Sequence, residues 1–203
     1  MLHLIYKGES VMPLLKSIEM RRSFRALDEK PIQNEILLRL AEAARLTPSW
    51  GNKQPWRIVT VTAPSQLTAL KATLTPGNYW AKKSPAIAAF VTSLDWDGRL
   101  DDGRDYALFD LGMAAMAYQL QAVEEGLIAH PIAGFDAASA KRVLDIPETA
   151  ILETLIILGF PGDPSGLSEK HLASETSARL RKPVDEIAGF DRWSDQLVPQ
   201  RRD

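Results

Sequence analysis

Residues 106–135 read YALFDLGMAAMAYQLQAVEEGLIAHPIAGF, and they contain the longest helix that the sequence predicts. Apolar and small side chains occupy nearly every side of the segment from about Tyr106 to Glu125, so this helix should be buried on most of its faces. Gly126 is the residue type that commonly ends a helix. Residues 128–135 then have the pattern of a strand that runs into a glycine-containing turn.

The segments on either side of this stretch alternate irregularly between helices and short strands. Strands are predicted at 57–62, 86–93 and 151–160, and helices at 13–20, 31–46, 65–74 (capped by Ser65) and 136–144 (capped by Asp136). This order indicates an α+β fold and not a regular βαβ repeat. Because no repeat or linker divides the chain, we expect a single domain over residues 1–203. Residues 1–12 are a candidate disordered start, and 188–203 a C-terminal extension.

Composition excludes several classes of function. A net charge of -2 and a pI of about 6.0 give no global positive field that would attract nucleic acid. The absence of cysteine excludes disulfides, thiolate metal sites, iron–sulfur clusters and a cysteine nucleophile. The three histidines are scattered, so no metal site is predicted. No run approaches the ~20 apolar residues of a membrane span, and no secretory signal is present, so we expect a cytoplasmic protein without a membrane partner.

Three polar clusters are candidates for binding chemistry. RRSFR at 21–25 and RLR at 179–181 supply guanidinium groups, which are planar forks suited to bidentate contact with phosphate. PSWGNKQPW at 48–56 supplies side-chain amides, which carry a donor and an acceptor and so suit the edge of a planar ring with N–H and C=O groups. Taken singly, each has an ordinary explanation as a solvated helix end, a plain loop or an unremarkable basic pair.

Taken together, and with PIAGF at 131–135, these motifs resemble the nitroreductase family of FMN enzymes. The four elements occur in the family's order and span roughly residues 14–187. The resemblance implies an α+β fold with a central mixed or antiparallel sheet flanked by helices, assembled as a homodimer with FMN at the subunit interface. It also implies an NAD(P)H-dependent oxidoreductase. FMN would be bound, NADH or NADPH would be a transient co-substrate, and a small acceptor such as a nitroaromatic or quinone would be reduced by a ping-pong mechanism.

The resemblance also implies roles for individual residues, by analogy with the family's motifs. The phosphate, the ribityl chain and the pyrimidine side of the ring would be contacted by Arg21, Arg22, Ser23 and Arg25. The ring would be lined, in part from the partner subunit, by Pro48, Ser49, Asn52 and Gln54. Ile132 and Gly134 would lie at the flavin edge, with the backbone N–H of Gly134 near N5, where no catalytic side chain is assigned. Arg179 and Arg181 would complete the phosphate site.

This sequence departs from the family pattern at two positions. Ala133 stands where many members carry glutamate, which leaves redox potential and substrate preference open, and Trp50 is bulkier than the residue often found there. Asn78 lies close to where some members place another ring contact. The effect of Ala133 and Trp50 on the pocket is not fixed by the sequence.

Other functions remain open at this point. One is a specialised family member that fragments flavin, removes halogen or reduces an unsaturated acid (an enoate). Another is a flavin-binding protein without catalysis. A third is a nucleic-acid-binding module that uses the 21–25 and 179–183 segments, which the slightly acidic net charge disfavours. The physiological acceptor and the choice between NADH and NADPH are likewise open.

Overall fold

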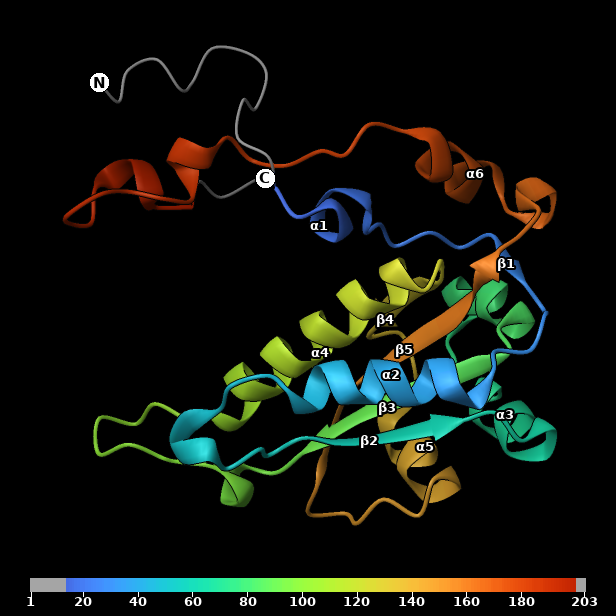
Figure 1. Ribbon diagram of the computed structural model, residues 1–203, viewed down its shortest axis with the longest axis horizontal. Helices are drawn as coiled ribbons and strands as arrows, with labels where there is room; N and C mark the ends of the chain where they lie inside the picture. The colour runs from blue at the N-terminus through green and yellow to red at the C-terminus, as the bar shows by residue number, and fades with distance from the viewer. Residues whose placement is uncertain (1–13, 200–203) are drawn as a thin grey trace.

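A computed structural model describes residues 14–199, and within them an antiparallel sheet forms the centre of the fold (Figure 1). Its strands are β1 (Leu27–Asp28), β2 (Arg57–Val61), β3 (Ala86–Thr92), β4 (Ile128–Ile132) and β5 (Ile151–Pro161). β5 pairs with β1, β3 and β4, and β3 pairs with β2. The predicted sheet, mixed or antiparallel, is therefore antiparallel in every pairing. The start predicted for residues 1–12 lies outside the described residues.

Helices cover both faces of this sheet. α2 (Asn34–Arg45) and α4 (Ala107–Glu124) pack on one face, and α3 (Pro64–Lys71) and α5 (Ala137–Val143) pack on the other. Two further helices, α1 (Lys16–Met20) and α6 (Glu169–Thr176), lie above the sheet in the view of Figure 1. Short 3₁₀ turns join these elements, at Trp50–Asn52, Pro76–Lys83, Leu94–Trp96, Pro164–Gly166, Val184–Glu186 and Asp195–Leu197.

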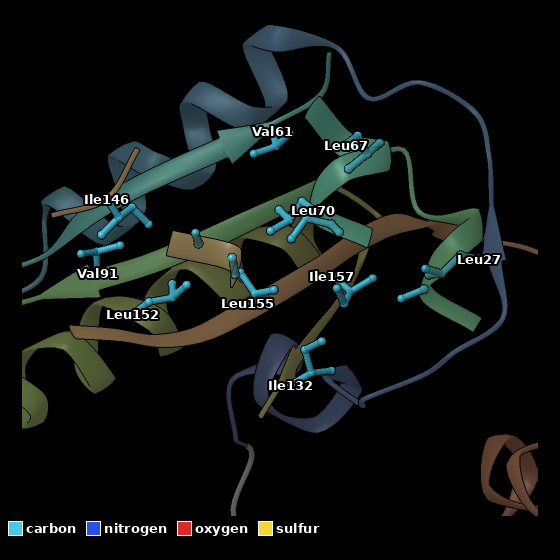
Figure 2. Close-up of a cluster of buried hydrophobic side chains, with 14 of the residues drawn as sticks. Leu27, Val61, Leu67, Leu70, Val91, Ile132, Ile146, Leu152, Leu155 and Ile157 are labelled. Atoms are coloured by element: carbon cyan, nitrogen blue, oxygen red, sulfur yellow. The ribbon is translucent and has the colours of Figure 1, made fainter. Parts of the chain in front are cut away.

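The core consists of two apolar layers separated by the sheet. In β3, Ala88 and Phe90 face α2 and α4, whereas Ile87 and Val91 face the other layer. All seven residues of this strand are buried, because an antiparallel sheet covered on both faces needs apolar side chains in both directions. Figure 2 shows the layer beneath α3 and α5, where Val91 gathers with other aliphatic side chains from the strands and from α3.

Most predicted elements are confirmed, with ends that shift by a few residues. The start of α3 is corrected: Ala63 is its N-cap and Pro64 its first residue, so Ser65 does not cap it, in keeping with the preference of proline for that position. Two elements were not predicted, β1, which is two residues long, and α6. The sequence does contain a signal for the start of α6, namely Ser168. Its hydroxyl accepts a hydrogen bond from the His171 N–H, so Ser168 is the N-cap of this helix.

One side of α4 differs from its prediction. Leu111 and Tyr118 are buried against the sheet, but the opposite stripe is open to solvent, with Leu108 43%, Phe109 61% and Met116 37% exposed. No element of residues 14–199 covers this stripe. The helix is therefore buried on one face in the single chain, and not on most faces as its composition predicts.

The C-terminal segment after α6 leaves the body of the chain. Its large apolar side chains are exposed, with Leu180 86%, Ile187 65%, Phe190 71% and Trp193 68% accessible. In Figure 1 this segment, drawn in red, extends to the upper left, away from the sheet. Within the part of the chain that the structure describes, no helix is both long enough and apolar enough to cross a membrane.

Candidate functional site

The two arginine clusters of the sequence meet in one pocket. Residues 21–25 run from the end of α1 toward β1, and the chain returns beside them after α6. Together they enclose a pocket of about 370 Å³, which is lined by residues 21–25, by Ser174 and by residues 177–181. Segments that lie about 150 residues apart in the sequence thus form the two walls of one concave surface.

Two of these arginines are tied to the end of α6. The Arg22 guanidinium donates to the Ser177 carbonyl at 2.7 Å, and that of Arg25 donates to the Ser174 hydroxyl at 3.0 Å. The Glu175 carboxylate accepts from the backbone N–H of Arg25 at 3.0 Å. A cation at the C-terminal end of a helix also offsets the partial negative charge of its last carbonyls. Ser174 and Glu175 were not among the predicted site residues, since α6 itself was not predicted.

Arg179 joins the last part of the chain to the first helix. Its Nη1 donates to the Ile18 carbonyl at 3.2 Å, and its Nη2 donates to the carbonyls of Glu19 at 2.6 Å and Arg21 at 2.7 Å. These are carbonyls at the C-terminal end of α1, which lack partners within so short a helix. Arg179 therefore fixes the wall of the pocket as well as lining it.

Arg21 and Arg181 carry charges that nothing in residues 14–199 neutralises. No carboxylate in that range forms an ion pair with either side chain. Arg21 contacts the Ser23 hydroxyl at 3.3 Å, and Arg181 donates to the Leu180 carbonyl at 2.7 Å. Burial lowers the pKa of the Arg21 guanidinium, and the charges of Arg179 and Arg181 lower it further. Several guanidinium groups around a pocket without a counter-ion form a donor set that fits a phosphate group.

A stack of three side chains begins at Arg25, which lines the pocket. The Arg25 guanidinium lies 5.9 Å from the Trp80 ring, and the Trp80 ring lies 4.5 Å from that of His130. The His130 Nδ1 makes a 3.0 Å hydrogen bond with the Phe24 carbonyl. Burial lowers the pKa of His130 to about 4, despite this hydrogen bond, so the neutral ring donates its Nδ1–H to the carbonyl at neutral pH. His130 therefore has a structural role in this part of the fold.

The turn after β4 is held by three hydrogen bonds to one carbonyl. The Gly134 oxygen accepts from the backbone N–H and the hydroxyl of Thr75, each at 3.0 Å, and from the Asn78 amide at 2.8 Å. A Cβ at residue 134 would lie 2.6 Å from the Asn78 Nδ2 and 2.7 Å from the Thr75 Oγ1. Only glycine fits at position 134, because the Asn78 and Thr75 side chains approach its backbone this closely. Ile132 ends β4 two residues before and is buried.

The predicted ring-lining loop has an unusual backbone. Gly51, Asn52 and Gln54 have φ values of 52°, 57° and 50°, in the left-handed region that is unfavourable for residues other than glycine. The Ser49 hydroxyl accepts from the Gln54 N–H at 2.9 Å, and the Gln54 amide donates to the Asn52 side chain at 3.0 Å. Such strain persists only where the surroundings enforce it, and it gathers at binding sites.

An unexpected residue anchors this loop. The Trp50 N–H donates to Asp110 Oδ2 at 2.7 Å, and Asp110 is fully buried in the first turn of α4. The signal in the sequence is an isolated acidic residue within an apolar helix, which must find a polar partner when it is buried.

The loop and the arginine pocket do not meet within one chain. In Figure 1 the 50–52 turn lies at the left, beside the start of α4, whereas residues 21–25 pass above the sheet toward β1 at the right. Pro48, Ser49, Asn52 and Gln54 are thus separated from the arginines. The turn at Gly134 is connected to the pocket through β4, because His130 of the same strand binds Phe24.

Comparison with known proteins agrees with the fold and with the motifs. The model of the Nitroreductase family matches residues 18–160. An NADH dehydrogenase of Thermus thermophilus is 27% identical over 173 residues, which cover 70% of this chain and 84% of that protein. A crystal structure of an oxidoreductase containing FMN superimposes with a TM-score of 0.80 at 28% identity and covers 92% of this chain and 96% of its own. A nitroreductase family protein from Clostridium novyi has a TM-score of 0.68 at 25% identity and covers 77% of this chain and 89% of its own. Because the family model covers most of the chain, as the four motifs predict, this protein belongs to the nitroreductase family.

Proposed function

We propose that this protein is an FMN-dependent oxidoreductase that takes hydride from NADH or NADPH and reduces a small acceptor, such as a nitroaromatic or a quinone, in a ping-pong cycle. The observation that carries the proposal is the arginine pocket, in which Arg21 and Arg181 have no carboxylate partner among residues 14–199. FMN, when bound, supplies the hydride chemistry at N5 of its ring.

Some residues of the pocket would contact the phosphate directly, and others hold the pocket walls in place. Arg21, Arg181 and the Ser23 hydroxyl would contact it directly, since their donors are the least engaged elsewhere. Arg22, Arg25 and Arg179 position the walls through their bonds to α6 and α1. Preorganised donors of this kind bind a dianion without further rearrangement.

The chain supplies orientation at the ring edge, and no proton donor. The three hydrogen bonds to the Gly134 carbonyl fix the backbone that would lie at the reactive edge, with the Gly134 N–H toward N5. Ala133 leaves this edge without the carboxylate of many family members. His130 is neutral, buried and committed to Phe24. Protons for the reduced acceptor would therefore come from solvent.

A homodimer would complete the site. The exposed stripe of Leu108, Phe109 and Met116 on α4 is an apolar surface of the kind that interfaces bury. A second copy packed there would bring its 48–54 loop toward the arginine pocket, which this loop does not reach within its own chain. The exposed C-terminal segment, with Phe190 and Trp193, would lie across the partner.

The test is the visible absorption spectrum of the freshly purified protein, followed by chromatography of the released chromophore and by NADH and NADPH oxidation with nitroaromatic and quinone acceptors. We expect a yellow protein that releases FMN and turns over with parallel double-reciprocal plots. A colourless protein that takes up no added FMN would overturn the proposal. A yellow protein without turnover would leave a flavin-binding protein and refute the catalytic part.

A further inference from the structure

Two carboxyl groups lie beside Trp50 of the 48–54 loop, and each has one oxygen with a hydrogen-bond partner and one without. Asp110 Oδ2 accepts from the Trp50 N–H at 2.7 Å, and Asp97 Oδ1 accepts from the Gly98 N–H at 2.8 Å. The other oxygens, Asp110 Oδ1 and Asp97 Oδ2, are both buried and find no donor in the described chain. A buried carboxylate oxygen without a donor is costly, so this arrangement requires an explanation.

The two unpaired oxygens belong to carboxyl groups that act on each other. Burial raises the pKa of Asp110, and the neighbouring Asp97 carboxyl raises it further, against the opposing effect of the Trp50 N–H. Two carboxyl groups that share a site cannot both ionise without repulsion. A single proton between them supplies the donor that both oxygens lack and removes one of the two charges.

We propose that Asp97 and Asp110 share one proton, and that this hydrogen-bonded pair locks the 48–54 loop in its binding conformation. Asp110 is then a positioning residue that acts on the ring-lining residues through Trp50. The part that concerns flavin rests on the proposed function, whereas the shared proton does not.

The pair joins two segments that are otherwise separate loops. Asp97 and Gly98 belong to the 93–106 segment, and the Trp50 ring packs so closely on Gly98 that a Cβ there would lie 2.5 Å from it. The same Trp50 donates its N–H to Asp110. The positive φ values at Asn52 and Gln54 follow directly along the chain. The lock therefore acts on the residue at which the strained part of the loop begins.

Neighbouring charged groups do not replace the proton. The charged side chains on the loop, on β2 and on the 93–106 segment are Lys53, Arg57, Asp95, Arg99, Asp101, Asp102, Arg104 and Asp105. Arg57 donates to the carbonyls of Gln54 and Trp56, and Arg99 donates to Asp105 at 2.8 Å. Among the contacts of residues 14–199, none of these side chains donates to the pair. With a pKa that the fold raises, Asp110 keeps the proton above the ordinary range of aspartate and loses it as pH rises through that raised pKa. The two carboxylates then repel each other and the 93–106 segment separates from α4, whereas the Trp50 N–H bond to Asp110 gains a charged acceptor and stays.

The experiment compares the wild-type protein with Asp97→Asn, Asp110→Ala and the control Asp102→Asn, which removes a charge from an exposed position of the same segment. The readout is the hydrogen-exchange protection factor of the Tyr106 amide, which donates to the Gly98 carbonyl at 3.2 Å and so reports whether the 93–106 segment stays against the start of α4. It is measured by NMR across a pH series in flavin-free protein. Wild type and Asp102→Asn should lose roughly tenfold or more in protection as pH rises, the lower end of the effect of a charge-assisted hydrogen bond. Asp97→Asn should stay protected throughout, because an amide donates at every pH. Asp110→Ala should be unprotected throughout.

Wild-type protection that does not change with pH, or an Asp97→Asn variant that follows the wild-type profile, would overturn the shared proton even if Asp110→Ala fails to fold. FMN dissociation constants for the same variants test the positioning role, and we expect them to follow the protection of the Tyr106 amide. FMN dissociation constants that do not change with this protection would refute the positioning role of Asp110. If no variant binds FMN, wild type included, the proposed function fails, and the Tyr106 protection factors still decide the shared proton.

Discussion

The substitution Arg21→Gln should change stability and FMN affinity in opposite directions. Without a ligand, the Arg21 charge is disfavoured by burial and by Arg179 and Arg181. Solvent screens this repulsion, because the side chain is only partly buried, so its removal should raise the free energy of unfolding by a few tenths of a kcal/mol, ~1 at most. The Ser23 contact that is lost is long, at 3.3 Å, and offsets little of this gain.

With FMN the sign reverses. The guanidinium supplies a charge-assisted hydrogen bond to the phosphate, typically worth ~1.5–3 kcal/mol. Its loss should weaken FMN binding by about 10- to 150-fold. Riboflavin, which lacks the phosphate, should bind wild type and variant equally. The control is Arg104→Gln, which removes an exposed arginine that pairs with Asp102 at 2.8 Å.

Flavin fluorescence titrations give both dissociation constants, and urea unfolding of the flavin-free protein gives the stability change. An Arg21→Gln variant that binds FMN as tightly as wild type would refute the assignment of the phosphate pocket. An equal loss for FMN and riboflavin would show that Arg21 acts on the ring or on the fold and not on the phosphate. A fall in the free energy of unfolding would refute the account of uncompensated charge.

Three further outcomes are expected. The folded-state pKa of about 4 for His130 lies below its unfolded value of 6.5. The neutral ring therefore contributes roughly 3 kcal/mol to the free energy of unfolding above pH 6.5, and this contribution is lost as pH falls toward 4. Urea unfolding across pH should show this loss in wild type and not in His130→Asn. Gly134→Ala should lower the free energy of unfolding by ~1–3 kcal/mol, because the new Cβ displaces the Thr75 hydroxyl and the Asn78 amide from the Gly134 carbonyl. The loss should be smaller in an Asn78→Ala background. Additive losses of the two substitutions in thermal unfolding would contradict the contact between residue 134 and Asn78. Phe109→Asp should convert a dimer to a monomer in analytical ultracentrifugation and release FMN, and an unchanged sedimentation coefficient would exclude the α4 stripe as the interface.

Sequence patterns predict the frame of the fold better than the details of the site. Residues 86–91 and 155–160, within β3 and β5, are continuous apolar runs, and helices on both faces of the sheet bury them as such runs require. The motifs also suggest that residues 21–25 and 179–181 act on one phosphate, and in the structure these segments line one pocket.

The unpredicted details depend on where distant backbone groups lie. Arg22 and Arg179 look alike in the sequence, yet one binds carbonyls after α6 and the other binds carbonyls at the end of α1. The pairing of Asp97 with Asp110 likewise arises only when the 93–106 segment folds against α4. The exposed stripe on α4 shows the same limit, since an apolar side chain does not specify whether its own chain or another one covers it.

The contacts of Arg179 also bear on how the protein is made. One wall of the arginine pocket is synthesised about 160 residues before the other, which Arg179 fastens to α1. Contacts between such remote segments form late in folding. A nascent chain that has not yet released residues 174–181 from the ribosome has only one wall of the proposed phosphate site. On the proposed function, loading of FMN would therefore follow synthesis of residues 174–181, and a chain cut short before Arg179 would lack one of the two walls of the pocket.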